Sequence, residues 1–205
     1  DSSTSRGLGD VYKRQEYYFS KKLREVAKMI SEGKPVINMG IGSPDLPPHP
    51  DVVLALKESF SYPKVHQYQS YQGIPELRIA IAEFYLRHYH VAANPNGEIL
   101  PLMGSKEGIM HISMAFLNPG DKALIPNPGY PTYQSVTRLV EATPVFYDLS
   151  ADNNWQPDLE LLNQMDLSGI KLMWINYPHM PTGANANQDI FKKLIDWARE
   201  RERFF

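Results

Sequence analysis

The sequence predicts an α/β domain with a mostly parallel sheet covered by helices on both faces, preceded by an N-terminal helix and loop segment. Two observations lead to this prediction. From about residue 98 onward, short apolar runs of strand length alternate with segments of helical periodicity, joined by short connections. The apolar run from Ile170 to Ile175 is typical of a strand buried inside such a sheet.

The first part of the chain is predicted to hold three helices and a loop. Apolar residues recur at helical spacing over 19–30, 52–60 and 74–85, and Pro75 suits the first position of the third helix. Residues 36–41 are predicted to be extended and lead into the Gly/Pro-rich stretch GIGSPDLPPHP. Its composition favours a surface loop, and loops of this kind often contact ligands.

The later part alternates between strands and helices. Strands are predicted at 99–103, 123–125, 145–149 and 172–175, and helices at 106–117, 133–140, 159–165 and 190–202, the last capped by Asn187. Ligands of such sheets bind at the carboxyl ends of the strands. The loops after Met103, Ile125 and Ile175 are therefore the candidates for function.

Composition excludes several classes of function. The chain has 205 residues, a net charge of −2 and no cysteine. We therefore expect no nucleic-acid partner, no membrane partner, no disulfide and no thiolate metal site, a pattern that suits a cytoplasmic protein. No apolar run approaches the roughly 18–20 residues that a membrane-spanning helix needs.

The two ends of the chain are unusual. Residues 1–15, DSSTSRGLGDVYKRQ, have neither helical nor strand periodicity and resemble translated vector read-through, with a natural disordered tail as the alternative. The last helix runs into Arg203-Phe204-Phe205 without a stop signal. We expect residues 1–15 to add nothing to the core, and the chain to be a fragment.

The loop LMGSKEGIMH leads a predicted strand through Gly104-Ser105-Lys106 directly into a helix. The first amides of a helix are unpaired and its dipole is positive there, so an anion such as phosphate can bind. A helix capped by Ser105, without a ligand, explains this segment equally well when it is considered alone.

The other two loops are rigid turns rich in proline. NPGYP projects Tyr130 from a strand end, where its ring either stacks on a flat ligand or packs the loop. NYPHMPTG stops a buried strand with two prolines three residues apart. Considered alone, it is equally a tight turn without a ligand.

Together, in this order and spacing, these segments resemble the pyridoxal-phosphate-dependent aminotransferases of fold type I, classes I and II. The resemblance covers residues 17–205, about the N-terminal half of such an enzyme. The segments GSKEGI, NPGYPTY and NYPHMPTGA resemble the phosphate cup, the ring-stacking loop and the N-P-x-N-P-T-G turn of the family. YQSYQGIPELR resembles its Y-x-x-x-x-G-x-x-x-L-R segment, with matches at Tyr68, Gly73, Leu77 and Arg78.

The resemblance implies pyridoxal 5′-phosphate as cofactor and a role for each matching residue. Gly104, Ser105 and Lys106 would hold the phosphate and Tyr130 would stack on the pyridine ring. Tyr68 would reach the cofactor of a partner subunit, which implies a homodimer, and Gly42 would lie near the substrate carboxylate.

Met180 departs from the family pattern. It stands where the family has an asparagine that bonds the 3′-oxygen of the cofactor, and methionine has no conventional donor. The resemblance also implies a cis peptide bond between Met180 and Pro181.

No catalytic residue is expected within this chain. Lys106 is not the Schiff-base lysine of the family, because Glu107-Gly108-Ile109-Met110 follows it in place of a nearby Gly-x-Arg. That lysine is expected beyond Phe205, so a chain ending there should be inactive. The implied organisation is a non-native or disordered segment at 1–15, an N-terminal segment of the small domain and substrate loop at 16–50, and an incomplete large cofactor-binding domain at 51–205.

The function implied is transfer of an amino group between an amino acid and a 2-oxo acid. A carbon–sulfur lyase or decarboxylase of the same fold is a second possibility. A third, from another class, is the aminotransferase-like ligand-binding domain of a transcription regulator, which would need a DNA-binding domain upstream.

Overall fold

The computed structural model describes residues 18–40, 42, 44–187 and 189–201. The segment 1–15, for which a non-native origin is expected, lies outside these residues. The chain divides into two compact units, with the boundary between Tyr68 and Gln69. The assignment of residues 16–50 to a small domain stays a prediction.

Among its described residues, the first unit contains the helices α2 (Tyr18–Ser31) and α3 (Pro50–Ser59). Helix α3 begins with Pro50 in its first turn, and the ring of His49, at the N-cap, accepts a hydrogen bond from the Asp51 amide. No residue of α3 is buried within the described structure. The bounds of α2 and α3 confirm the helices predicted at 19–30 and 52–60. The apolar positions of these helices do not form a core in the described structure.

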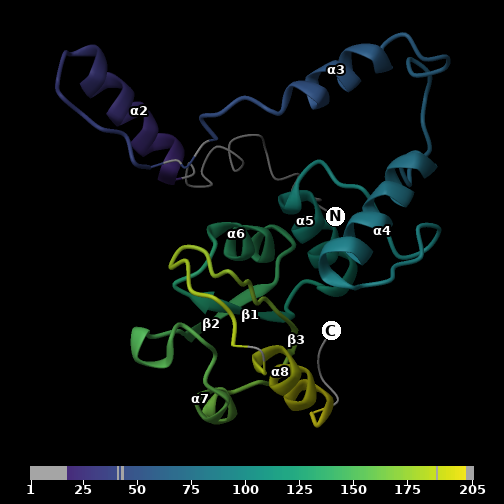
Figure 1. Cartoon of the computed structure of the whole chain (residues 1–205). Helices are drawn as coiled ribbons and strands as arrows, with labels where there is room; N and C mark the ends of the chain where they lie inside the picture. The colour runs from purple at the N-terminus through teal and green to yellow at the C-terminus, as the bar shows by residue number, and fades with distance from the viewer. Residues whose placement is uncertain (1–17, 41, 43, 188, 202–205) are drawn as a thin grey trace, which may run out of the picture. The chain divides into compact units, whose positions relative to one another are not determined.

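The second unit is built around a parallel sheet (Figure 1). Its elements, in chain order, are α4 (Pro75–Tyr89), α5 (Ser105–Phe116), β1 (Lys122–Asn127), α6 (Pro131–Leu139), β2 (Thr143–Asp148), the short 3-10 helix η1 (Ala151–Asn153), α7 (Leu159–Gln164), β3 (Ile170–Met173) and α8 (Ile190–Arg199). The strand order is β2-β1-β3, and both pairings are parallel. Strand β1 is therefore central, with its residues 123–126 buried.

The two faces of β1 belong to different hydrophobic clusters. Leu124 packs with Leu162 of α7 and with residues of α8 that include Leu194. Ile125, its neighbour in the strand, packs with Ile109 of α5 and with residues of α6. Because side chains alternate across a strand, helices cover both faces of the sheet, as predicted.

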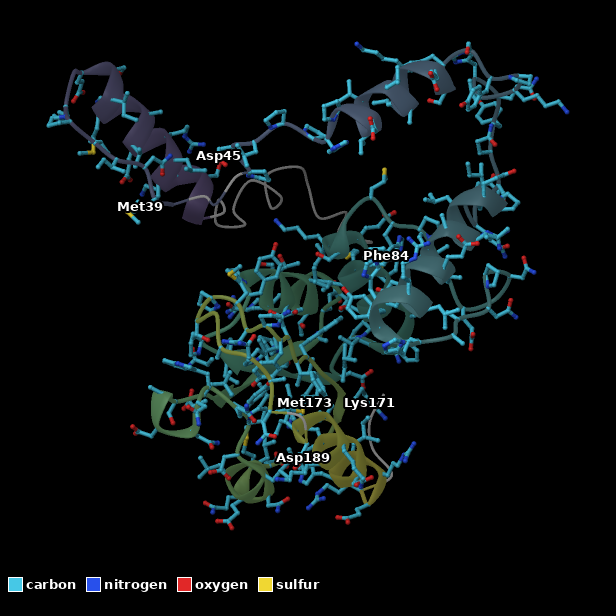
Figure 2. All side chains as sticks on the ribbon, viewed as in Figure 1. Met39, Asp45, Phe84, Lys171, Met173 and Asp189 are labelled. Carbon is cyan, nitrogen blue, oxygen red and sulfur yellow. The ribbon has the colours of Figure 1, made fainter. Side chains whose placement is uncertain are left out.

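Strand β3 borders the sheet in the described structure, next to α8. Met173, labelled in Figure 2, is partly buried against the cluster that includes Leu194 and Trp197 of α8. The Trp174 amide donates to the Leu124 carbonyl at 2.9 Å, so pairing with β1 continues just past the end of β3.

The predicted strand at 99–103 is wrong. These residues form no strand in the described structure, and Pro101 in their midst cannot donate a backbone hydrogen bond to a neighbour. Pro101 instead packs closely on Gly73, where an added Cβ would lie 2.8 Å from the proline Cγ. The other large apolar side chains of the segment, Leu100, Leu102 and Met103, are exposed in the described structure.

The predicted cap of the last helix needs a smaller correction. Asp189, not Asn187, occupies the N-cap of α8. The Asn187 side chain still acts just ahead of the helix, because its oxygen accepts the Asp189 amide at 3.1 Å.

Candidate functional site

The strand order reverses direction at the carboxyl end of β1, which is where ligands of such sheets bind. Strands β2 and β3 lie on opposite sides of β1, and the connecting helices α6 and α7 lie on opposite faces. Loops that leave such strands therefore diverge and leave room for a ligand. The 127–131 loop follows β1, and the turn of residues 176–184 follows β3.

The N-terminus of α5 carries the predicted anion-binding residues. Gly104 is the N-cap, with φ +99°, a conformation that glycine adopts without strain, and the helix begins at Ser105. Because Gly104 and not Ser105 occupies the N-cap, the alternative of a serine-capped helix is not observed. Ser105 and Lys106 are both exposed in the first turn.

Glu107 stabilises this helix end without blocking it. Its carboxylate accepts the Met103 amide at 2.5 Å and lies 3.4 Å from the His111 ring. The hydrogen bond from Met103, more than the contact with His111, lowers the pKa of the Glu107 carboxyl. The carboxylate thus turns back toward the preceding loop, as in a capping box.

Lys106 and Tyr130 lie next to each other although they belong to different loops. The Lys106 ammonium lies 5.7 Å from the centroid of the Tyr130 ring. Tyr130 packs edge-on against Tyr133 at 5.9 Å, and Tyr133 stacks on Trp174 at 4.9 Å with 15° between the planes. A cation and a supported aromatic ring therefore share one site.

The 127–131 loop is held at its base. The Asn127 side-chain amide donates to the Asp148 carboxylate at 2.7 Å, and the Leu149 amide donates to the Asn127 carbonyl at 2.8 Å. A Cβ at Gly129 would lie 2.2 Å from the Pro126 carbonyl oxygen. Only glycine therefore fits this bend, which precedes Tyr130.

The 176–184 turn is closed by its own hydrogen bonds. The His179 amide donates to the Ala184 carbonyl and the Gly183 amide donates to the His179 carbonyl, both at 2.7 Å. The Asn176 side chain accepts the Met180 amide at 3.1 Å. The peptide bond between Met180 and Pro181 is cis, as predicted, and those before Pro128 and Pro178, which we did not predict, are cis as well.

The donor set suits a phosphate-bearing planar ligand. Backbone amides, a hydroxyl and an ammonium at a helix N-terminus provide donors for an oxyanion, and the adjacent phenol ring provides a flat apolar surface. The chemistry of these groups thus fits pyridoxal phosphate. Within the described residues, no group of three or more His, Asp or Glu side chains could hold a metal ion.

The structure brings two of the predicted site residues together. The Lys106 ammonium lies by the Tyr130 ring, Gly104 and Ser105 precede Lys106 at the same helix end, and Met180 is 54% exposed on its turn. Tyr68 and Gly42 belong to the first unit and are exposed, Tyr68 fully. Their predicted roles toward cofactor and substrate stay predictions.

Sequence reasoning missed three supporting residues, Tyr133, Trp174 and His179. Tyr133 and Trp174 have the signal of large aromatic residues next to the predicted loops, but their stacking depends on the pairing of β1 with β3. His179 is a polar residue inside a proline-rich turn, and its burial, with 3% exposed, appears only in the structure.

Comparisons with known proteins show the family of the chain. A family model for class I and II aminotransferases matches residues 34–204. The LL-diaminopimelate aminotransferase of Aquifex aeolicus (strain VF5) is 41% identical over 184 residues, which cover 90% of this chain and 48% of that protein. Transaminase BacF of Bacillus subtilis (strain 168) is 41% identical over 187 residues, 91% of this chain and 46% of its own length.

A solved structure has the same arrangement. The substrate-bound structure of BacF from Bacillus subtilis matches with a TM-score of 0.87 at 38% identity, covering 96% of this chain and 50% of that one. The chain thus spans about half the length of the curated relatives it matches. On the family match over residues 34–204 and this identity across most of its length, the chain belongs to the class I and II aminotransferases.

Proposed function

We propose that the whole protein containing this chain is a pyridoxal-phosphate-dependent aminotransferase, which moves an amino group between an amino acid and a 2-oxo acid. Members of the family use this cofactor. The observation that carries the proposal is the Lys106 ammonium 5.7 Å from the Tyr130 ring centroid, at the N-terminus of α5. The Lys106 ammonium and the Tyr130 ring thus lie together near the carboxyl end of β1, where ligands of such sheets bind.

The residues of this chain would bind and orient the cofactor. Backbone amides at Gly104 and Ser105, the Ser105 hydroxyl and the Lys106 ammonium would hold the phosphate. Tyr130, supported by Tyr133, would lie against the pyridine ring. Bound pyridoxal phosphate supplies an electron sink for chemistry at the amino acid Cα, and the protein fixes which bond faces that sink.

Other roles belong to the same proposal. Tyr68 would act on the cofactor of a partner subunit in a homodimer, and Gly42 would lie near the substrate carboxylate. The full exposure of Tyr68 is compatible with a role across an interface. No helix in the described ranges is both long and apolar enough to cross a membrane, and we propose a cytoplasmic location.

The relatives favour transamination over the alternatives. Proteins named LL-diaminopimelate aminotransferase and transaminase BacF match at the same 41% identity. The lyase, decarboxylase and transcription-regulator interpretations have no such support. We therefore keep amino acids and 2-oxo acids as the proposed substrate classes.

The test is cofactor binding by the whole protein, followed by absorbance of the bound cofactor. Ser105→Ala combined with Lys106→Ala should raise the dissociation constant roughly a hundredfold, since two phosphate contacts of about 1.5 kcal/mol each are lost. Lys193→Ala, which removes an exposed lysine on α8, is the matched control. A wild-type protein that does not bind the cofactor, or a double variant that binds as tightly, would overturn the proposal.

A further inference from the structure

Glu107 is the residue through which α5 holds the segment of chain that enters it. The Oε2 atom of its carboxylate accepts the Met103 amide at 2.5 Å. Its own backbone amide donates to the Gly104 carbonyl at 3.2 Å. The side chain and the backbone of Glu107 therefore hold two consecutive residues, one on each side of the peptide bond between Met103 and Gly104.

The bond to the Gly104 carbonyl decides where the next backbone amide points. In a trans peptide unit the C=O and N–H groups lie in one plane and point in opposite directions. Because the Gly104 carbonyl is turned toward the Glu107 amide, the Ser105 N–H points out of the N-terminal end of α5. This N–H is one of the donors that we assign to the cofactor phosphate.

The bond to the Met103 amide holds the other side of Gly104. Gly104 has φ +99° and ψ 160°, and a glycine has the widest choice of backbone conformations of any residue. Its conformation therefore depends on how its neighbours are held. With Met103 bonded to the Glu107 side chain, the directions open to the Gly104 N–H are restricted as well.

Packing supports the same path of the chain. The Leu102 side chain lies against Gly108 of α5, where an added Cβ would be 2.7 Å from Leu102 Cδ1. The residue before Met103 is thus in contact with the helix too. Glu107 and the backbone around Gly104 therefore form one arrangement, which continues from the approach into the first turn of α5.

His111 is the other neighbour of the Glu107 carboxylate, and a weaker one. Its Nε2 lies 3.4 Å from Oε1, and its side chain is 58% exposed. Exposed pairs of this kind contribute little to stability. The bond to Met103, rather than the contact with His111, is the interaction that connects Glu107 with Gly104.

We propose that Glu107 is a positioning residue for the phosphate-binding amides of Gly104 and Ser105, and that it acts as the hydrogen-bond acceptor of Met103 rather than through its charge. This inference rests on the proposed function, in which these amides hold the cofactor phosphate. The negative charge of Glu107 by itself opposes a phosphate nearby. The reach of the side chain and its charge therefore have opposite effects on affinity.

Three substitutions separate reach from charge. Glu107→Gln keeps an acceptor oxygen at the same reach and removes the charge. Glu107→Asp keeps the charge but is shorter by one methylene, which withdraws its oxygens from the Met103 amide, and Glu107→Ala has neither property. The whole protein with each change is titrated with pyridoxal phosphate and, separately, with pyridoxal, which lacks the phosphate.

The Asp and Ala variants should raise the dissociation constant of pyridoxal phosphate about tenfold, as expected when phosphate donors lose their alignment. The Gln variant should bind pyridoxal phosphate at least as tightly as wild type. Binding of pyridoxal should be unchanged in all three variants, because the amides in question contact only the phosphate. His111→Ala, which leaves the bond to Met103 in place, is the matched control and should bind both ligands as wild type does.

The outcomes separate the two proposals. Wild-type protein that does not bind pyridoxal phosphate overturns the proposed function and this inference with it. Wild type that binds, with Asp and Ala variants that bind as tightly, overturns only the role of Glu107. An equal loss of affinity for both ligands would mean that Glu107 merely stabilises the fold, and would overturn the inference too.

The Gln variant gives a separate test of the mechanism. If it bound pyridoxal phosphate as weakly as the Ala variant, the charge of Glu107 and not its reach would be decisive, and the inference would be wrong. If Glu107→Ala does not fold, the comparison of Glu107→Asp with Glu107→Gln decides the same question.

Discussion

Met180 lies on the 176–184 turn with its side chain exposed and its backbone amide bonded to Asn176. The backbone amide of Met180 thus has a hydrogen-bond acceptor although the Met180 side chain is not polar. The thioether has no conventional donor for the cofactor contact that we predict at this position, whereas the α5 terminus supplies several donors for a phosphate. We therefore expect the phosphate site to dominate affinity.

Met180→Asn should change cofactor binding only moderately. A neutral hydrogen bond contributes about 0.5–1.5 kcal/mol net, so affinity should rise by no more than about tenfold, with a shift in the absorbance of the bound cofactor. Titration of the whole protein measures both. If this single change altered affinity more than Ser105→Ala with Lys106→Ala, the assignment of the phosphate site would be wrong.

Gly129→Ala should be far more damaging than an ordinary glycine substitution. The new Cβ would lie 2.2 Å from the Pro126 carbonyl oxygen, so the 127–131 loop must move, and Tyr130 with it. We expect a loss of about 1–3 kcal/mol in unfolding free energy and weaker cofactor binding. Gly97→Ala is the control, since its Cβ would meet nothing within 4 Å. Equal behaviour of the two variants in urea unfolding and cofactor titration would contradict the prediction.

At the scale of elements, the approach to β3 is tied to β1 by Asp166. Its carboxylate accepts the Ser168 amide at 2.9 Å and lies 3.4 Å from the Lys122 ammonium of β1. The hydrogen bonds from Ser168, with Lys122 as a smaller cause, lower the pKa of Asp166 to about 2. The link helps to fix where β3 begins beside the central strand.

Asp166→Asn should therefore lower stability in a pH-dependent way. A carboxyl whose pKa falls from 3.8 to about 2 on folding stabilises the protein above pH 3.8 and loses this contribution as pH falls toward 2. The midpoint of urea unfolding should be lower for the variant than for wild type at pH 6. The difference between the two midpoints should become smaller below pH 3.8. A gap that is constant with pH would show that the Asp166 charge is not involved.

At the scale of the whole molecule, the cofactor site that we propose includes Lys106, which we assign to the phosphate and not to covalent attachment. Lys106 is directed to the Tyr130 ring at the anion site. The cofactor-linking lysine of the proposed enzyme should therefore belong to the residues beyond Phe205.

Covalent labelling tests this assignment. The whole protein is loaded with pyridoxal phosphate, reduced with borohydride and digested, and the labelled peptide is identified by mass spectrometry. We expect one stoichiometrically labelled lysine, outside residues 1–205. Stoichiometric labelling of Lys106, or of any other lysine in this chain, would contradict both this prediction and the assignment of Lys106 to the phosphate.

The sequence by itself determined the α/β class, the helices and the three loops. Helical periodicity and proline or glycine at segment ends are local properties, and they correctly located α4, α5 and α6 near their observed bounds. The order of the loop motifs identified the family. Local patterns failed at 99–103, where apolar residues suggested a strand but Pro101 packs on Gly73 instead.

Only the tertiary structure decided which side chains meet. The contact between Lys106 and Tyr130 joins the first turn of α5 to the loop after β1, and the stacking of Tyr133 on Trp174 requires β3 to pair with β1. His179 shows the difference clearly, since its residue type gave no sign that the ring would be buried. Such contacts depend on the order of the strands in the sheet, which local sequence patterns do not show. Strand order is decided by the free energy of packing, and all neighbouring segments contribute to it at once.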